Sequence, residues 1–250
     1  MIVSVIVPTF NRAHYLGPAL KSIPTSAGGL EVEIVVVDDG STDDTPQVVE
    51  QYLKEGYRLQ YIQQANSGIA VARNAGLENL GADTEFVTFL DSDDVFPDGA
   101  LAAQLEVLQS DHALDLVYGR MVMTDQIDPF TLAPSKEARQ LALVGIHLSC
   151  ALLRRSVIDR VGMFDTDFVQ AEDTDYLLRV FESGAKFRQT DTVCLYYRRH
   201  PQNVTKDIAE SRRFFARAIQ KSMVRRRRDP SIKLVKPEFA VQQVGTMEFY

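Results

Sequence analysis

Phe86-Val-Thr-Phe-Leu-Asp-Ser-Asp-Asp94 is an apolar run that ends in three carboxylates within four positions. Such a run is typical of a buried parallel strand, and the carboxyl ends of parallel strands are where open α/β sheets bind ligands. Asp91 and Asp93 are two positions apart, so both can face one hard cation, for which Mg²⁺ or Mn²⁺ is the best match. A solvated acidic turn before a helix near Asp98 is the alternative that these residues leave open.

The composition is that of an ordinary globular protein, with 250 residues, 45% hydrophobic and 24% charged. No apolar stretch approaches the roughly 18 residues of a membrane span. The start, Met1 to Pro8, reads as a strand rather than as a signal peptide. We expect Cys150 and Cys194 to be reduced core thiols, and the protein to be cytoplasmic.

The charge is unevenly distributed along the chain. Residues 206–228 hold nine Lys or Arg and two Asp or Glu, a local net charge of +7 within a chain of net charge −7. The remaining residues therefore sum to −14, which argues against a nucleic-acid surface on the main body. An anionic partner for the basic segment stays open.

Strands and helices are predicted to alternate. Apolar β-branched runs indicate strands at 3–7, 32–37, 58–62, 86–90, 116–118, 148–153 and 193–197. Helices are expected at 12–22, 42–54, 67–80 with Ser67 as N-cap, 100–109, 173–182 and 208–228. This pattern predicts an α/β fold with a mostly parallel sheet covered on both faces. Residues 121–146, which include Pro129 and Pro134, are expected to form a functional loop.

Polar clusters follow three of the predicted strands. Pro8 to Arg12 follows the first strand, Asp38 to Ser41 the second, and Asp91 to Asp94 the fourth. Because the carboxyl ends of parallel strands meet at one edge, we expect these clusters to share a rim. The sequence contains no G-x-G-x-x-G, no G-x-x-x-x-G-K-[ST] and no G-x-S-x-G, which disfavours dinucleotide oxidoreductases, P-loop NTPases and α/β-hydrolases.

Several segments resemble glycosyltransferase family 2: Val3-Ser-Val-Ile-Val-Pro-Thr-Phe-Asn-Arg12, Ile34-Val-Val-Val-Asp-Asp-Gly-Ser-Thr-Asp43, Asn66-Ser-Gly-Ile-Ala-Val-Ala-Arg-Asn74 and Phe89-Leu-Asp-Ser-Asp-Asp94. Glu172-Asp173 and Tyr197-Arg-Arg-His200 also resemble its motifs. The resemblance spans about residues 1–205 and implies an inverting, metal-dependent enzyme of GT-A fold, which is Rossmann-like. The family pattern often carries a Trp shortly after the Glu-Asp pair; this chain has no Trp and Tyr176 lies in that neighbourhood, so acceptor stacking is expected to differ. The chain also lacks membrane spans and the Gln/Arg-rich, Trp-containing signature of processive synthases, so single transfers are expected.

The resemblance implies a nucleotide-diphosphate sugar as donor. Asp39 would accept a hydrogen bond from a uracil-like imide N–H, which favours UDP and then dTDP, and Arg73 would contact the phosphates unless it is a surface arginine. The expected donor-binding residues are Pro8, Thr9, Asn11, Arg12, Asp38, Asp39, Asn66, Arg73, Asp91 and Ser92.

The resemblance also implies a metal site and a catalytic base. Asp93, Asp91 and His200 are expected to hold Mn²⁺ or Mg²⁺, which neutralises the departing diphosphate. Inversion needs one base to take the proton of the acceptor hydroxyl, and Asp173 is the candidate, with Glu172 in reserve. Acids in a first helical turn are otherwise dipole partners.

We divide the chain into a catalytic domain at 1–205, with a donor half at 1–110 and an acceptor half at 111–205, and a basic helical tail at 206–250. The tail helix either packs its apolar stripe of Phe214, Phe215, Ala218, Ile219 and Met223 on the domain, with its basic side solvated, or attaches to anionic lipid. The second reading would place the enzyme at the inner face of the membrane, near a lipid-linked or other glycan acceptor.

Two other classes of function remain open. Asp91-Ser-Asp-Asp-Val95 fits the Asp-x-Asp-x-[Thr/Val] signature of haloacid-dehalogenase-type phosphatases, although those enzymes carry it after the first strand and here three strands precede it. A non-catalytic sugar-nucleotide-binding module is the other alternative. It predicts ligand binding without turnover and tolerance of substitution at Asp173.

Overall fold

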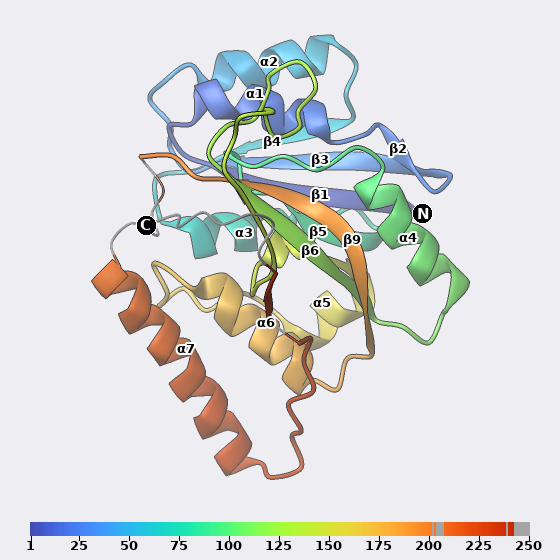
Figure 1. Ribbon diagram of the computed structural model, residues 1–250, viewed down its shortest axis with the longest axis vertical. Coiled ribbons are helices and arrows are strands. Elements are labelled where there is room, and N and C mark those ends of the chain that lie inside the picture. The colour runs from blue at the N-terminus through green and yellow to red at the C-terminus, as the bar shows by residue number, and fades with distance from the viewer. Residues whose placement is uncertain (202, 204–207, 239, 243–250) are drawn as a thin grey trace.

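Figure 1 shows a computed structural model that describes residues 1–201, 203, 208–238 and 240–242. Its first strands are β1 (Ile2–Thr9), β2 (Ser26–Ala27), β3 (Leu30–Asp38), β4 (Leu59–Gln63) and β5 (Thr84–Phe89). The later strands are β6 (Leu116–Thr124), β7 (Gln140–Val144), β8 (Ala151–Arg154), β9 (Phe187–Arg198) and β10 (Ala240–Gln242).

These strands form one mixed sheet in the order β10-β7-β6-β8-β5-β1-β3-β2, with β4 paired to β3 and β9 to β6. The core of the sheet is parallel, because β5, β1, β3 and β4 all run in the same direction. Antiparallel pairing begins at β8, which joins β5 to β6. The parallel half places the carboxyl ends of β1, β3 and β5 on one edge.

Helices cover both faces of this sheet, as predicted. They are α1 (Ala13–Ser22), α2 (Thr45–Lys54), α3 (Ile69–Glu78), α4 (Ala100–Ser110), α5 (Arg155–Val161), α6 (Glu172–Glu182) and α7 (Ile208–Arg228), with a short 3₁₀ helix η1 (Leu148–Cys150). In Figure 1, α1 and α2 lie above the sheet, α3, α5 and α6 lie below it, and α7 runs along the outside of α6. None of the helices in the described ranges is long and apolar enough to cross a bilayer.

Close packing explains why the central strands carry apolar residues on both faces. Every residue of β1 is buried, which matches its position between two neighbouring strands and under helices on both sides. Helix α3 approaches β1 so closely that a Cβ on Gly76 would lie 2.5 Å from Cγ2 of Ile6. A side chain at residue 76 would therefore push the helix, and the arginine that it carries, away from the sheet.

Three local predictions are wrong. Ser67 does not cap α3; Gly68 is the N-cap, at φ 92°, and the backbone N–H of Ser67 donates to Asp39 instead. Residues 121–146 are not a loop throughout, because they contain the end of β6 and all of β7. Residues 148–153 begin as η1 rather than as a strand. A tertiary partner that the local sequence does not reveal accounts for the first two cases, Asp39 for Ser67 and the paired strands for β7, whereas η1 is closed by local bonds to His147.

The tail helix is observed at the predicted residues, but only part of its predicted apolar stripe is buried. Phe214 and Ala218 are buried, whereas Phe215 and Met223 are 45% and 53% exposed. Phe214 and Ala218 pack with Phe168 and Leu178 in a small second core. The prediction that the basic side is solvated holds for Arg217, whose side chain is 40% exposed, but is wrong for Lys221 and Arg225, which pair with less exposed acids of the main body.

Candidate active site

The polar clusters that follow β1, β3 and β5 lie along one rim, as predicted from the parallel sheet. Thr9, the last residue of β1, pairs in register with Asp38, and its carbonyl accepts the N–H of Asp39 at 2.9 Å. The N–H of Leu90, just before Asp91, donates to the Ile6 carbonyl at 3.0 Å. These bonds bring the Asp38–Asp39 pair and the Asp91 cluster to the same edge.

Asp38 and Asp39 both organise loops at this rim. Asp38 is 1% exposed and accepts hydrogen bonds from the Ser41 N–H at 2.8 Å and from the Tyr61 hydroxyl at 2.6 Å. Asp39 Oδ1 accepts from the Ser67 N–H and from Gln64 Nε2, and Oδ2 accepts from the Gly68 N–H at 2.8 Å. Asp39 therefore fixes the turn that carries Asn66, an exposed residue, into α3.

The close approach of this turn to β3 requires a glycine. Gly40 has φ +84°, and a Cβ there would lie 2.9 Å from the backbone nitrogen of Asn66. On the other side, Asn11 at φ 51° accepts the Thr42 N–H at 2.8 Å and donates its own N–H to Ser41 Oγ. The loops after β1, β3 and β4 thus form one connected edge.

Arg73 connects the acids after β5 to the acids of α6. It is 2% exposed, and its Nη2 donates to Asp91 Oδ1 at 2.6 Å while its Nη1 donates to Glu172 Oε1. Although burial opposes ionisation, the Arg73 charge holds the pKa of Asp91 below its ordinary value. A contact between Arg73 and a phosphate stays a prediction.

Asp93 lies on the outer side of the rim, next to two basic groups. Its Oδ2 is 2.9 Å from His200 Nε2 and 3.7 Å from Arg12 Nε. Arg198 donates through Nε to the Asp93 carbonyl at 3.0 Å, and the Arg198 N–H donates to Asp94 Oδ1 at 2.8 Å. The end of β9 therefore holds the acidic turn in place, and it brings His200 against Asp93, as predicted.

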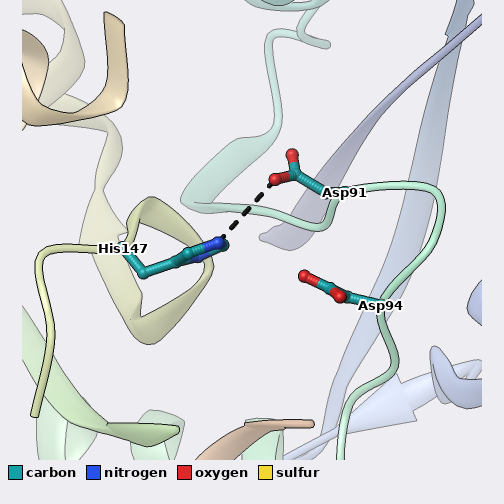
Figure 2. A group of neighbouring side chains, drawn as sticks. All are labelled: Asp91, Asp94 and His147. Carbon is teal, nitrogen blue, oxygen red and sulfur yellow. Dashed lines mark ion pairs between the residues drawn. The ribbon is translucent and has the colours of Figure 1, made fainter. Parts of the chain in front are cut away.

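Asp94 and His147 form a second group around Asp91 (Figure 2). One ligand atom from each of Asp91, Asp94 and His147 lies within 4.8 Å of the others, and His147 Nε2 is 3.8 Å from Asp91 Oδ2. Asp94 is 1% exposed, and its Oδ2 has no hydrogen-bond partner among the described residues. Burial, and then the charges of Asp93 and Asp91, raise the pKa of Asp94 well above that of an ordinary aspartate.

The sequence prediction did not include His147, Asp94 or Arg198 as site residues. Asp94 belongs to the quoted acidic run and could have been included on that signal. His147 is a lone histidine that belongs to no motif. It lies between β7 and η1, and this connection brings it to the rim. Arg198 belongs to the quoted Tyr197–His200 segment, but its sequence does not predict which carboxylate it meets.

Glu172 and Asp173 begin α6, directly after Ala171, a non-glycine residue at φ 58°. Burial raises the pKa of Glu172 to about 7, despite the attraction of Arg73, and burial also raises the pKa of Asp173. Among the described residues, only Thr174 hydrogen-bonds to the Asp173 carboxylate, through Oδ1. Arg73 thus occupies one carboxylate oxygen of Glu172, whereas Asp173 Oδ2 remains available to a ligand.

The predicted site residues converge, although they differ in accessibility. Thr9, Asp38, Asp39, Arg73, Ser92, Glu172 and His200 are buried, while Asn66 is exposed. Pro8 is buried within β1, opposite Val37. A cluster of acids, two histidines and three arginines at the carboxyl end of a parallel sheet can hold a hard cation and a phosphorylated ligand beside a carboxylate base.

Comparisons with known proteins agree with this geometry. Residues 1–349 of S. aureus TarS in complex with UDP match with a TM-score of 0.65 at 26% identity, over 88% of this chain and 65% of that one. The mannosyltransferase PcManGT from Pyrobaculum calidifontis, in complex with GDP-Man and Mn²⁺, shares the fold, with a TM-score of 0.66 at 21% identity over 89% of this chain and 64% of that one.

The chain is also similar in sequence to curated glycosyltransferases. EpsJ of Bacillus subtilis, an uncharacterized glycosyltransferase, is 27% identical over 82% of this chain and 63% of its own length. The GalNAc(5)-diNAcBac-PP-undecaprenol beta-1,3-glucosyltransferase of Campylobacter jejuni is 42% identical over 44% of this chain and 35% of its own length. The glycosyltransferase GlyA of Streptococcus pneumoniae is 44% identical over 37% of this chain, which covers only 13% of GlyA.

The mainly parallel sheet with helices on both faces is therefore a GT-A fold, in agreement with the matching structures. The sequence profile described as Glycosyl transferase family 2 matches residues 4–162, which is more than half of the chain. The chain belongs to glycosyl transferase family 2.

Proposed function

We propose that this protein is an inverting, non-processive glycosyltransferase that moves a sugar from a UDP-sugar to an acceptor hydroxyl with the help of a divalent metal. The observation that carries the proposal is the bridge through Arg73, which places the Asp91 acids beside Glu172 and Asp173 on one rim. A metal-and-diphosphate site and a base for the acceptor are the two parts that this reaction needs.

UDP is the proposed nucleotide, with dTDP second. Asp39 Oδ2 accepts one described hydrogen bond, from Gly68, so a lone pair remains for the imide N–H of uracil or thymine. The TarS structure at 26% identity contains UDP, which supports the same choice. Asn66, which is exposed beside Asp39, and the backbone at the end of β1 near Pro8 and Thr9 would contact the base and ribose.

The donor atoms of the rim fit Mg²⁺ or Mn²⁺. Asp93 and His200 meet at 2.9 Å and would hold the ion together if Asp91, on the same turn, moved toward them when the metal binds. Asp94 and His147 offer an alternative donor set around Asp91. The ion would neutralise the charge that develops on the departing diphosphate. Arg12, 3.7 Å from Asp93, would add a further positive charge at this position.

Asp173 is the proposed base. Its carboxylate is half-buried, its pKa is raised by burial, and no arginine pairs with it among the described residues. A raised pKa makes this carboxylate a stronger proton acceptor for the attacking hydroxyl. Glu172 is less suited to the role because Arg73 occupies one of its oxygens. Its proposed part is to hold the Arg73 bridge.

The acceptor is proposed to be a glycan or a lipid-linked glycan in cell-surface polysaccharide assembly. The name of the Campylobacter jejuni relative includes an undecaprenol-linked substrate, and another relative, GgaA of Bacillus subtilis, is named as a teichoic acid biosynthesis protein. The outer face of α7 exposes Phe215 and Met223 beside Arg227 and Arg228, an arrangement that suits peripheral contact with anionic lipid.

Family membership argues against the phosphatase alternative. Asp91 follows β5, the partner of β1 on the side away from β3, instead of the first strand of the chain. A non-catalytic sugar-nucleotide-binding module would need no base at the start of α6. It therefore predicts that substitution of Asp173 is tolerated, whereas the proposed enzyme requires this residue.

UDP release from UDP-sugars in the presence of Mn²⁺ tests the proposal. Asp93→Ala is expected to abolish UDP release while the protein stays folded, because the Asp93 carboxylate lies on the rim and its main contact is with His200. Asp191→Ala is a matched control, since it removes one exposed carboxylate from β9, far from the acidic turn in sequence. Wild-type turnover by the Asp93→Ala protein refutes the metal role.

A further inference from the structure

Helix α7 contacts the segment that leads into the proposed base. Arg217 donates through Nη1 to the Asp167 carbonyl and through Nη2 to Asp167 Oδ2, both at 3.1 Å. One turn further along α7, Lys221 forms an ion pair with Asp165. Two acids within the segment 165–171, six to eight residues before Asp173, are therefore held by bases of α7.

Apolar and amide contacts secure the same segment. Phe168 is 1% exposed and packs against Phe214 of α7, with ring centroids 6.3 Å apart. The Ser211 hydroxyl donates to Gln170 Oε1 at 2.7 Å, and Gln170 Nε2 donates to Glu210 Oε2 at 3.0 Å. Among the described residues, every hydrogen bond or ion pair that reaches residues 165–170 from elsewhere in the chain comes from α7.

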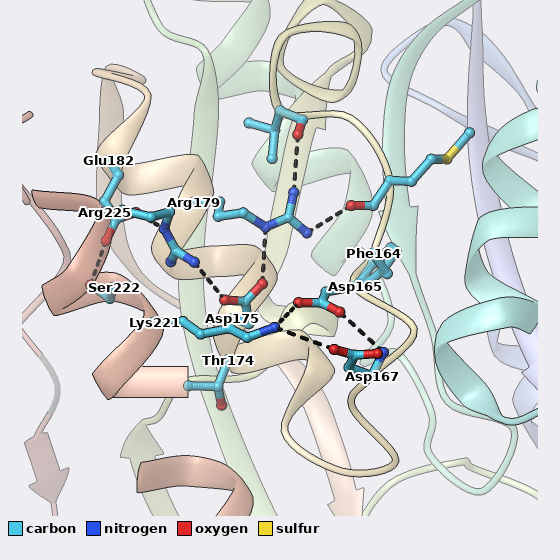
Figure 3. Close-up of polar contacts among 12 residues, drawn as sticks. Phe164, Asp165, Asp167, Thr174, Asp175, Arg179, Glu182, Lys221, Ser222 and Arg225 are labelled. Carbon is cyan, nitrogen blue, oxygen red and sulfur yellow. Dashed lines mark hydrogen bonds and ion pairs between the residues drawn. The ribbon is translucent and has the colours of Figure 1, made fainter. Parts of the chain in front are cut away.

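A second anchor joins α7 to the body of α6 (Figure 3). Arg225 donates through Nε to Glu182 Oε2 at 2.6 Å and through Nη1 to Asp175 Oδ1 at 2.9 Å, and Ser222 also hydrogen-bonds to Glu182. The other oxygen of Asp175 accepts from Arg179 at 3.0 Å. Asp175 and Glu182 are both buried, and these basic partners compensate them.

The start of α6 has little local support of its own. Ala171 adopts a left-handed conformation, and no side chain caps the helix. A non-glycine residue keeps such a conformation only where its surroundings hold it. Here Arg73 holds Glu172 itself, and α7 supplies the surroundings on both sides of Glu172 and Asp173, through the segment before them and through Asp175 after them.

We propose that α7 is a positioning element for Glu172 and Asp173, with Arg225 and Lys221 as the positioning residues that act through α6 and the segment 165–171. The expected effect on kcat rests on the proposed function, whereas the placement of α6 by α7 does not. This placement assigns part of the basic charge of α7 to ion pairs with acids of the main body, so those bases are already engaged and less available to an anionic partner.

Hydrogen exchange tests the placement without any activity. Arg225→Gln removes the two contacts to α6, and Arg228→Gln removes the same charge from an exposed residue of the same helical turn. We expect amides at 165–175 to exchange about tenfold faster in Arg225→Gln than in Arg228→Gln, with the rim after β1 and β3 unchanged. Equal exchange at 165–175 in the two variants overturns the proposal.

Kinetics test the consequence. With Mn²⁺ and the UDP-sugar that the wild type turns over, kcat is expected to fall roughly 10²-fold in Arg225→Gln, because small displacements of a catalytic group have effects of that order. The Kd for UDP should change far less than kcat, since Asp39 lies on another element and only Arg73 links the donor residues to Glu172. Arg225→Lys, which can reach only one carboxylate at a time, should restore part of kcat. A parallel loss of UDP affinity shows general damage and overturns the positioning role.

The placement of α6 by α7 can still be tested if Arg225→Gln fails to fold or if the wild type is inactive. If Arg225→Gln does not fold, Lys221→Gln replaces it, because the Lys221 side chain is 33% exposed and its loss leaves the core intact. The same contrast with Arg228→Gln then supports or overturns the proposal. If the wild type turns over no nucleotide sugar, the proposed function fails, while the exchange comparison still decides whether α7 holds the segment 165–171.

Discussion

Replacing Arg73 with methionine is expected to destabilise the protein strongly. Arg73→Met keeps the volume of a long side chain but leaves Asp91 and Glu172 facing each other without the charge that separates them. Removing one partner of a buried ion pair typically costs 3–5 kcal/mol, because the other charge stays buried and uncompensated. For a chain of this size, at roughly 2–4 °C per kcal/mol, the melting temperature should fall by roughly 6–20 °C.

The loss should depend on pH in a defined direction. The pKa of Glu172 is already about 7 in the native protein, and it rises further when Arg73 is absent. A carboxyl group whose native pKa exceeds its unfolded pKa loses stability as the pH rises through the native value. The gap between wild type and Arg73→Met should therefore be smallest near pH 5.5 and grow toward pH 8.5, by at most about 1.4 kcal/mol per unit.

Urea unfolding followed by circular dichroism at pH 5.5, 7 and 8.5 measures the gap. Arg58→Met is the matched control, because Arg58 also pairs with two carboxylates, Glu31 and Glu33, but its side chain is 50% exposed. Its loss should cost at most about 1 kcal/mol. If Arg73→Met unfolds like Arg58→Met, or if the gap closes as the pH rises, the buried bridge does not hold the rim together.

The remaining predictions concern the base and the membrane. Asp173→Asn should keep UDP affinity and lose roughly 10²–10⁴-fold in transfer, and a near-normal kcat would move the role to Glu172. Because burial raises the pKa of Asp173, the acid limb of kcat/KM should lie above about 3.9, the ordinary aspartate value, so a profile that is flat down to pH 4 contradicts the assignment. Co-sedimentation with anionic vesicles should weaken with salt and disappear in Arg227→Gln/Arg228→Gln, and no sedimentation at low salt would make α7 purely structural.

The sequence predicts the parallel half of the fold and its rim well. Asp91 and Asp93 follow an apolar run, and strands such as β1 are buried on both faces, so hydrophobicity alone locates them. The carboxyl ends of parallel strands then share an edge whatever the details of the loops. Only the family resemblance predicts that His200 lies beside Asp93, since the two residues are far apart in the chain.

The rest depends on tertiary contacts that local patterns do not encode. His147 reaches Asp91 because β7 and η1 form in a region that reads as a loop, and a single histidine carries no periodic signal. The basic residues of α7 read as a solvated face, since nothing in their own sequence shows that Asp175 and Glu182 would be opposite. Arg73 reads as a phosphate ligand or a surface residue, whereas its burial follows from the packing of α3 against the sheet.

Nucleotide-sugar binding measured with and without metal tests the central claim most directly. UDP-, dTDP- and GDP-sugars are added to the wild type and to Asp93→Ala, and melting temperatures are compared in Mn²⁺ and in excess chelator. We predict stabilisation by UDP-sugars, then by dTDP-sugars, in Mn²⁺ only, because Asp91 and Asp93 would otherwise repel the diphosphate. The shift should be absent in Asp93→Ala. An equal shift in chelator, or no shift with any nucleotide sugar, would contradict the assignment of this rim as a metal-dependent donor site.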